Sequence, residues 1–390
     1  MKILDTIQRA LTAAGLDTRN GPTRGVTETI EQALSAAGLG KGVGTRVDRA
    51  TVIEVLAPGD HAAGDAGDGR ATDLPGTPAG PAGAGEFISR TYRNDAGSRT
   101  YKLYVPAGYA ADMAGAVPLL VMLHGCTQSA DDFAAGTRMN ALADRHGFLV
   151  VYPEQAANAN GSKCWNWFRP GDQVRDHGEP SLIAGITREV ASRYRVDERR
   201  IFAAGLSAGA AMAVTLGATY PELYAAIGAH SGLPHGAAHD MASAFGAMKQ
   251  GPSAGRGSRP RTAAGVPGGA TARAVPTIVF HGDRDHTVHA SNGAAIVAQV
   301  RAGRADDAGL RASVREDVVS GGRRHRHTVH VDADNRPVVE QWELHGAGHA
   351  WSGGSSSGSF TDAQGPDASV EMIRFFYAQP VPGAGATGPA

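Results

Sequence analysis

A serine flanked by small residues, GLSAG at residues 205–209, is a pattern that suits a nucleophile. It follows an apolar run at 201–204, which predicts a strand, and it opens an alanine-rich stretch at 208–219, which predicts a helix. Small residues on both sides of Ser207 allow a turn so tight that the hydroxyl projects at the sheet edge, near the helix N-terminus. This setting favours a nucleophilic serine over a structural turn of small residues.

A serine hydroxyl is a poor nucleophile unless a base takes its proton. In strand–turn–helix folds of this kind, the expected chain order is serine, then an acid, then a histidine. Asp283 and Asp285 directly follow an apolar run at 277–280. We expect Asp285 to orient the histidine because it lies farther along the loop, and Asp283 to cap the turn. The alternative is that both are turn acids.

His349 is the expected base, because it lies in a glycine-flanked loop after the apolar run at 338–344. His345 is its nearest competitor, and we interpret it as a packed side chain at the strand end. The loop after the run at 118–123 carries Cys126, whose backbone N–H is expected to form an oxyanion hole with that of Ala208. In the same loop we expect His124 to brace the chain by hydrogen bonds.

The elements that must position these residues alternate between short apolar runs and helical patterns. The expected strands lie at 101–105, 118–123, 148–152, 201–204, 225–229, 277–280 and 338–344. The expected helices lie at 131–144, 181–194, 208–219, 292–301 and 368–377. Such alternation predicts an α/β fold with a mostly parallel sheet and helices on both faces. Ligands of such folds bind at the carboxyl ends of the strands, where the candidate residues lie.

The composition excludes several classes of protein. The chain has 390 residues, and 37 basic and 38 acidic side chains give a net charge of −1, which argues against a nucleic-acid binder. No apolar run is long enough for a transmembrane helix. Two cysteines are too few for a four-cysteine zinc site, and we predict neither a metal nor an organic cofactor. Asp5, Gln8 and Arg9 interrupt the apolar N-terminus, so we predict no secretory signal.

The chain divides by composition into a catalytic domain and its flanks. We predict a helical N-terminal extension at 1–56, built from two similar halves, and a flexible Gly/Pro/Ala linker at 57–85. The extension is a helical pair that docks on the main domain, or else a targeting or oligomerisation module. The catalytic domain is expected at 86–378, with a disordered insertion, or else a basic lid, at 246–274. A disordered tail is expected at 379–390.

Six motifs together resemble the poly(3-hydroxybutyrate) depolymerase-type esterases, a group similar to feruloyl and acetylxylan esterases. They are LHGCTQ at 123–128, CWNWF at 164–168, GLSAG at 205–209, HGDRDHTVH at 281–289, GAGHAWSGG at 346–354 and GPDAS at 365–369. The resemblance covers about residues 86–378 and implies an α/β-hydrolase fold. It implies a serine carboxylester hydrolase with Ser207 as nucleophile, Asp285 as orienting acid and His349 as base.

The resemblance implies a polyester or an aryl or acyl ester as substrate. Two alternatives stay open: a serine peptidase of the same fold, and a binding protein that acts through residues 1–56. The resemblance favours an extracellular location, whereas the N-terminal sequence favours the cytoplasm. The oligomeric state is not predicted.

The same resemblance favours a disulfide between Cys126 and Cys164 over two buried thiols. Trp165, Trp167 and Trp351 lie in loops near the expected site, where their rings would stack on a substrate or else pack in the core. The run RRHRHTVH at 323–330 is interpreted as the solvated edge of a β-hairpin.

Overall fold

Short apolar segments form the centre of the protein, because strands that are covered on both faces must be apolar along their whole length. The computed structural model describes residues 85–110, 115–251, 274–304, 307–320 and 322–380, all within one structural unit, residues 73–390. The predicted N-terminal extension at 1–56 and most of the linker and tail lie outside the described residues.

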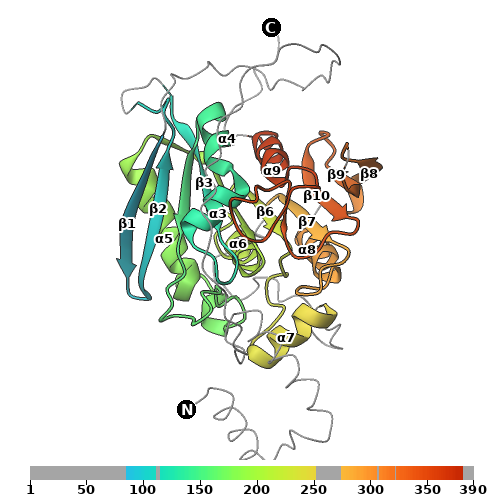
Figure 1. Cartoon of the computed structure of the whole chain (residues 1–390), viewed down its shortest axis with the longest axis horizontal. Helices are drawn as coiled ribbons and strands as arrows, with labels where there is room; N and C mark the ends of the chain where they lie inside the picture. Colours follow the sequence, from blue (N-terminus) through green and yellow to red (C-terminus); the bar gives the residue numbers. More distant parts are fainter. Residues whose placement is uncertain (1–84, 111–114, 252–273, 305–306, 321, 381–390) are drawn as a thin grey trace, which may run out of the picture. The chain divides into compact units, whose positions relative to one another are not determined.

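Ten strands form one sheet in the order β1-β2-β4-β3-β5-β6-β7-β10-β9-β8 (Figure 1). They are β1 Glu86–Asn94, β2 Gly97–Val105, β3 Val117–Leu123, β4 Leu149–Pro153, β5 Val196–Leu206, β6 Ala226–His230, β7 Thr277–Gly282, β8 Arg311–Val318, β9 Arg324–Val331 and β10 Pro337–Leu344. The six strands from β4 to β10 in this order pair in parallel, and the outer pairs are antiparallel. The prediction of a mostly parallel α/β sheet is therefore confirmed.

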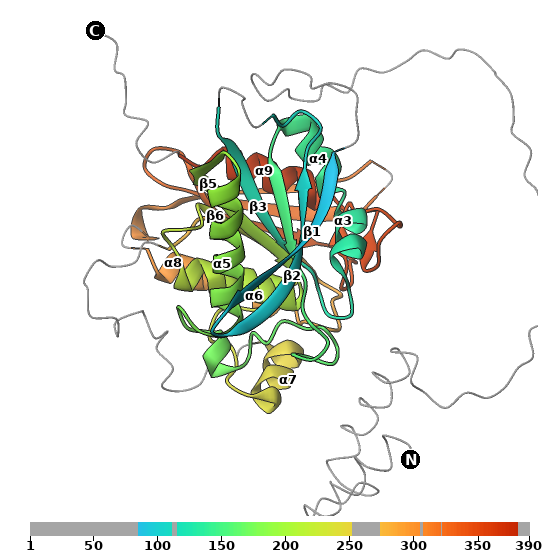
Figure 2. The ribbon, with the colours of Figure 1, turned by 90° about the vertical axis from the view of Figure 1, so that its left-hand side faces the viewer.

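Helices cover both faces of this sheet, and each face has its own apolar cluster. The helices are α3 Ala130–Thr137, α4 Met139–His146, α5 Gly178–Arg193, α6 Ala208–Thr219, α7 Met241–Gln250, α8 Ser291–Ala302 and α9 Ala368–Tyr377. One cluster contains buried residues of α5, α6 and α8, and the other contains those of α3, α4 and α9. Figure 2, seen from the side of β1 and β2, shows α5 and α8 to the left of these strands and α3 to their right. Successive residues of β3 alternate between the clusters, with Leu119 and Val121 in the first and Leu120 and Met122 in the second.

Several elements differ from the prediction. β1 was missed, because as an edge strand it is only half-buried and lacks a continuous apolar run. The helix expected at 131–144 is two helices, since Arg138 between them has a left-handed backbone with φ of 55°. Its guanidinium donates to Asp367 Oδ2 at 2.7 Å and to the Gly353 carbonyl at 2.8 Å, which ties this break to the loop before α9.

Two predicted disordered segments begin too early. Helix α7 contains residues 246–250 of the expected insertion, because a reciprocal capping box between Asp240 and Ser243 starts a regular helix there. Residues 252–273 of that insertion lie outside the described residues. Gln379, the first residue of the expected tail, is buried, and its amide donates to the Pro337 and Phe375 carbonyls.

The basic run at 323–330 is not the edge of a hairpin. It forms β9, which lies between β8 and β10, and β8 is the fully exposed edge strand. Within β9, His327 stacks on Trp342 and contacts Glu340 Oε2 at 2.8 Å. The alternation of histidine with arginine therefore marks a strand with one packed face rather than a solvated one.

Candidate active site

The three expected catalytic residues follow three strands of the parallel region. Ser207 follows β5, Asp285 lies in the loop after β7, and His349 lies in the loop after β10. These strands are neighbours in the order β5-β6-β7-β10 and run parallel. Their carboxyl ends therefore meet at one edge of the sheet, where ligands of such folds bind.

Ser207 occupies a strained backbone conformation between β5 and α6. Its φ is 57° and its ψ is −119°, outside the regions that side-chain-bearing residues prefer. Two contacts hold it there: its N–H donates to the His230 carbonyl at 2.9 Å, and its own carbonyl accepts from the Ala211 N–H at 3.0 Å. A side chain at Gly209 would collide with the Leu123 carbonyl, which explains the need for glycine at this place.

Asp285 and His349 are joined by a hydrogen bond. His349 Nδ1 lies 2.7 Å from Asp285 Oδ2, and the Asp285 side chain is fully buried. The N–H groups of Thr287 and Val288 donate to Asp285 Oδ1 at 2.9 and 2.8 Å. Burial alone would raise the pKa of Asp285, but the hydrogen bond with His349 and the backbone donors hold that pKa below its ordinary value. The carboxylate thus stays ionised and fixes His349 with its free Nε2 directed away from the acid.

Asp283 does more than cap its own turn. Its carboxylate accepts from the Gly346 N–H at 2.7 Å and contacts His345 Nδ1 at 3.1 Å, so it holds the start of the His349 loop. His345 is not a packed side chain as expected, because it is about a third exposed and also faces Glu316. Asp283 therefore holds the backbone of the loop, whereas Asp285 holds the His349 ring.

Ser207 and His349 are not hydrogen-bonded in this structure. Ser207 and the loop that carries His349 both contact His230. The Ser207 N–H donates to the His230 carbonyl, and the Ser352 N–H, three residues after His349, donates to the His230 ring. Ser207 and the His349 side chain are each about a tenth exposed. Such bonds are often long without substrate and shorten when it binds.

The loop after β3 is held rigidly beside the tight turn at Ser207, which we call the elbow. His124 Nδ1 lies 2.7 Å from the Gly125 carbonyl, while its Nε2 accepts from the Gln155 N–H at 3.0 Å. This pair of contacts is the bracing that we expected of His124. Among the described residues, the N–H groups of Cys126 and Ala208 donate no hydrogen bond, as the donors of an oxyanion hole require.

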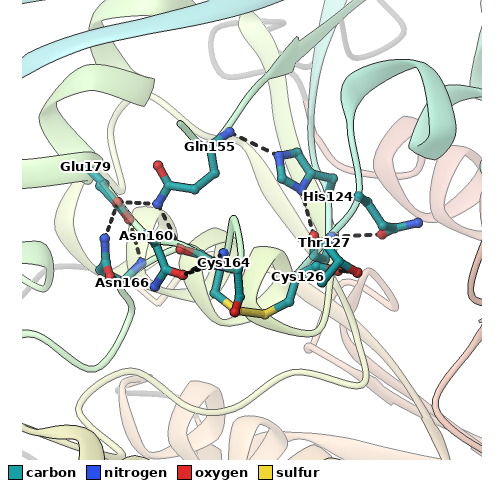
Figure 3. Close-up of a disulfide and its surroundings, with 11 residues drawn as sticks. His124, Cys126, Thr127, Gln155, Asn160, Cys164, Asn166 and Glu179 are labelled. Carbon is teal, nitrogen blue, oxygen red and sulfur yellow. Dashed lines mark hydrogen bonds between the residues drawn. A yellow bond between two sulfur atoms is a disulfide. The ribbon is translucent and has the colours of Figure 1, made fainter. Parts of the chain in front are cut away.

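Cys126 and Cys164 form a disulfide that joins this loop to the segment after β4 (Figure 3). Their Cα atoms are 4.2 Å apart, and 38 positions separate them in the sequence. Gln155 reaches the Cys164 carbonyl at 2.8 Å. The crosslink therefore fixes the residue whose N–H is the candidate oxyanion donor.

A buried carboxylate linked to the disulfide segment through Gln155, that of Glu179, was missed by sequence reasoning. It accepts from the Asn166 N–H at 2.6 Å, from the Asn166 side chain at 2.7 Å and from the Gln155 amide (Figure 3). It also accepts from Arg99 at 3.1 Å. Burial raises the pKa of Glu179, and the nearby Asp172 adds to this. The sequence around residue 179 does not predict a buried carboxylate, because the groups that bind it belong to other segments of the chain.

The three tryptophans are core residues. Trp165, Trp167 and Trp351 are 0, 6 and 1% exposed, so the expected stacking of their rings on a substrate is wrong. Trp351 packs edge-on against Phe133 and stacks on His230 at a centroid distance of 5.3 Å. The rings support the loops of the site from within.

In the described part of the chain, no cluster of three or more His, Cys, Asp and Glu side chains is arranged to hold a metal ion. In the same residues, no helix is both long and apolar enough to cross a membrane.

Comparison with known proteins decides the family. The family model "Esterase PHB depolymerase" matches residues 99–319, more than half of the chain. The chain belongs to the esterase PHB depolymerase family. A curated relative, poly(3-hydroxyalkanoate) depolymerase C of Paucimonas lemoignei, is 35% identical over 246 residues, which are 63% of this chain and 57% of the relative.

Further relatives agree with this family. Feruloyl esterase B of Neurospora crassa is 34% identical over 142 residues, 36% of this chain and 46% of that protein. Acetyl xylan esterase from Aspergillus awamori superposes with a TM-score of 0.53 at 18% identity, over 76% of this chain and all of that one, which supports the α/β-hydrolase fold. This chain spans about half the length of the curated relatives that it matches.

The disulfide yields a first prediction. Replacing both Cys126 and Cys164 by alanine is expected to lower the free energy of unfolding by about 4 kcal/mol, because a closed loop of this length is released in the unfolded chain. Urea unfolding of both proteins measures the difference. The matched control is the denatured, unreduced wild-type protein, in which we expect no reactive thiol; titration of two thiols there would contradict the crosslink.

The buried histidines yield a second prediction. Burial lowers the pKa of His124, His230 and His281, that of His230 to about 3. Above about pH 6.5 these rings are neutral in both the folded and the unfolded protein. Below that pH the rings of the unfolded chain become protonated, whereas those of the folded protein stay neutral. Each ring therefore lowers stability by up to about 1.4 kcal/mol per pH unit as the pH falls toward its folded pKa.

Urea unfolding between pH 7.5 and 5.5 measures this slope. His124→Gln is expected to make the slope shallower, by up to about one proton at the acidic end of this range. An unchanged slope in His124→Gln would show that this ring titrates alike in both states.

Proposed function

We propose that this chain is a serine carboxylester hydrolase with Ser207 as nucleophile, His349 as general base and Asp285 as the acid that orients it. The observation that carries the proposal is the 2.7 Å hydrogen bond between His349 and the buried Asp285, at the sheet edge where Ser207 sits in a strained turn. A histidine held by a buried carboxylate beside an activated serine is the arrangement of acyl-transfer enzymes.

The proposed cycle has two halves. His349 Nε2 takes the proton of the Ser207 hydroxyl as its oxygen attacks the ester carbonyl carbon, and the N–H groups of Cys126 and Ala208 stabilise the resulting oxyanion. His349 then gives the proton to the leaving alcohol, and an acyl-enzyme remains. Water, deprotonated by His349, then attacks the acyl carbon. As the bond between this carbon and the Ser207 oxygen breaks, His349 returns the proton to the serine, and the acid is released.

The proposed substrate is a polyester of the hydroxybutyrate type or an aryl or acyl ester. The names of the relatives support this class, because they refer to poly(3-hydroxyalkanoate), feruloyl and acetylxylan esters.

Replacing Ser207 by alanine tests the nucleophile. We expect kcat on a p-nitrophenyl ester to fall to background, and Asp285→Asn to lower it by about 10³–10⁴-fold, because the histidine loses its orienting charge. Stopped-flow or steady-state release of nitrophenol measures both. The exposed Ser357→Ala is the matched control and keeps wild-type turnover. Turnover retained by Ser207→Ala would overturn the proposed function.

A panel of substrates tests the class. It contains short-chain nitrophenyl esters, hydroxybutyrate oligomers, methyl ferulate, acetylated xylan and an anilide matched to the best ester. We expect esters to be cleaved with kcat/KM values far above that of the anilide, because an amine leaves less readily than an alcohol. Comparable rates on the matched ester and anilide would instead indicate a peptidase.

A further inference from the structure

His230, the last residue of β6, is a fully buried histidine that the proposed cycle does not use. A buried imidazole is costly unless its polar atoms are satisfied, so the identity of its partners indicates why it is there. Both ends of this residue contact the candidate machinery, one through the backbone and one through the ring.

The backbone end holds the nucleophile. The carbonyl of His230 accepts the Ser207 N–H at 2.9 Å, the first contact beyond the paired residues Leu206 and His230 of β5 and β6. Ser207 has a positive φ, and such a conformation persists only where its surroundings fix it. The position of the serine backbone is therefore tied to the end of β6.

The ring end holds the loop of the general base. His230 Nε2 accepts the Ser352 N–H at 3.0 Å, and Ser352 lies three residues after His349. The ring stacks on Phe280 at 5.7 Å and on Trp351 at 5.3 Å, so packing on both sides fixes its plane. The start of the same loop is held from the other side, by Asp283 through the Gly346 N–H.

The hydrogen bonds also fix the tautomer. Because Nε2 accepts the Ser352 N–H, the ring proton lies on Nδ1, which faces Ser231 Oγ at 3.2 Å. Burial, together with the neighbouring His281 and His349, lowers the pKa of His230 to about 3, although Asp285 opposes this shift. The ring is therefore a neutral acceptor over the pH range in which the esterase would work.

We propose that His230 is a positioning residue, which sets the distance between the Ser207 hydroxyl and the His349 ring by holding the Ser207 N–H and the Ser352 N–H at once. This inference rests on the proposed function. In this proposal the hydrogen bond accepted by Nε2 of His230, and not the size of the imidazole ring, fixes His349 opposite Ser207.

Two amide substitutions of His230 distinguish the effect of its hydrogen-bond acceptor, Nε2, from the effect of the packing of its ring. In His230→Gln the amide oxygen lies two bonds beyond Cγ, as Nε2 does, and reaches the Ser352 N–H. In His230→Asn it lies one bond beyond Cγ, at the place of Nδ1, and does not reach. Both variants lose the aromatic stacking, so they differ in the reach of the acceptor.

The measured quantity is kcat per active site on a nitrophenyl ester, with sites counted by titration with a fluorophosphonate. We expect kcat per site to fall at least about tenfold in His230→Asn with KM nearly unchanged, and to stay within about threefold of wild type in His230→Gln. His325→Asn, which removes another buried histidine packed on a tryptophan, is the matched control and keeps wild-type kcat per site.

Equal kcat per site in the Asn and Gln variants would overturn the proposal, because a role in packing alone lowers stability and the number of titrated sites but not turnover at each site. If neither variant folds, ¹⁵N NMR of selectively labelled wild-type protein decides instead. A proton on Nε2 of His230 between about pH 6 and 8 would overturn the proposal, and an unprotonated Nε2 supports it.

Failure of this inference is distinguishable from failure of the proposed function. Turnover retained by Ser207→Ala removes the function itself. An inactive Ser207→Ala together with equal turnover in the two His230 variants leaves the function in place and removes the role of His230.

Discussion

The reversal of the chain at Ser207 is the constraint on which the rest of the site depends. A positive φ at a residue with a side chain costs free energy and must be held by its surroundings. Three contacts fix this conformation. The His230 carbonyl accepts the Ser207 N–H, and the Ala211 N–H of helix α6 donates to the Ser207 carbonyl. The third is the close approach of Gly209 to the Leu123 carbonyl. That last contact brings the end of β3 against the elbow. Ser207 and the loop that carries Cys126 are therefore positioned by one packing contact, and neither is free to move alone.

The charges of the site are arranged around one buried carboxylate. Asp285 stays ionised because backbone N–H groups and His349 stabilise its charge, while burial keeps His281 and His230, which lie near it, neutral. A second cation here would compete with His349 for the same carboxylate. Neutral rings that each satisfy one backbone group, the Val288 carbonyl for His281 and the Ser352 N–H for His230, support the loops without disturbing this balance.

The sequence predicted well those elements whose signal is a local pattern of apolar residues. Strands buried on both faces are continuous apolar runs, so β3, β4, β6 and β7 were found, and with them the loops that carry the candidate triad. β1 was missed because it is a half-buried edge strand without a continuous apolar run. The break at Arg138 was missed because the partners of its guanidinium, Gly353 and Asp367, lie far away in the chain. The same holds within the site: the types of Ser207, Asp285 and His349 follow from motif and order. The link from His230 to Ser352 spans 122 positions and leaves no local signal.

The loop after β3 shows how one residue can serve two purposes. Cys126 contributes its backbone N–H to the proposed oxyanion hole, so the reaction places no demand on its side chain. That side chain is instead joined to Cys164, and the segment around Cys164 is fixed by Gln155, which Glu179 holds in turn. An oxyanion donor is effective only if it is already in place when charge develops, since moving it then would cost the energy it supplies. A crosslink at the donor residue itself is the most direct way to meet that requirement, because it is attached through the Cβ and Sγ atoms of the same residue that carries the N–H.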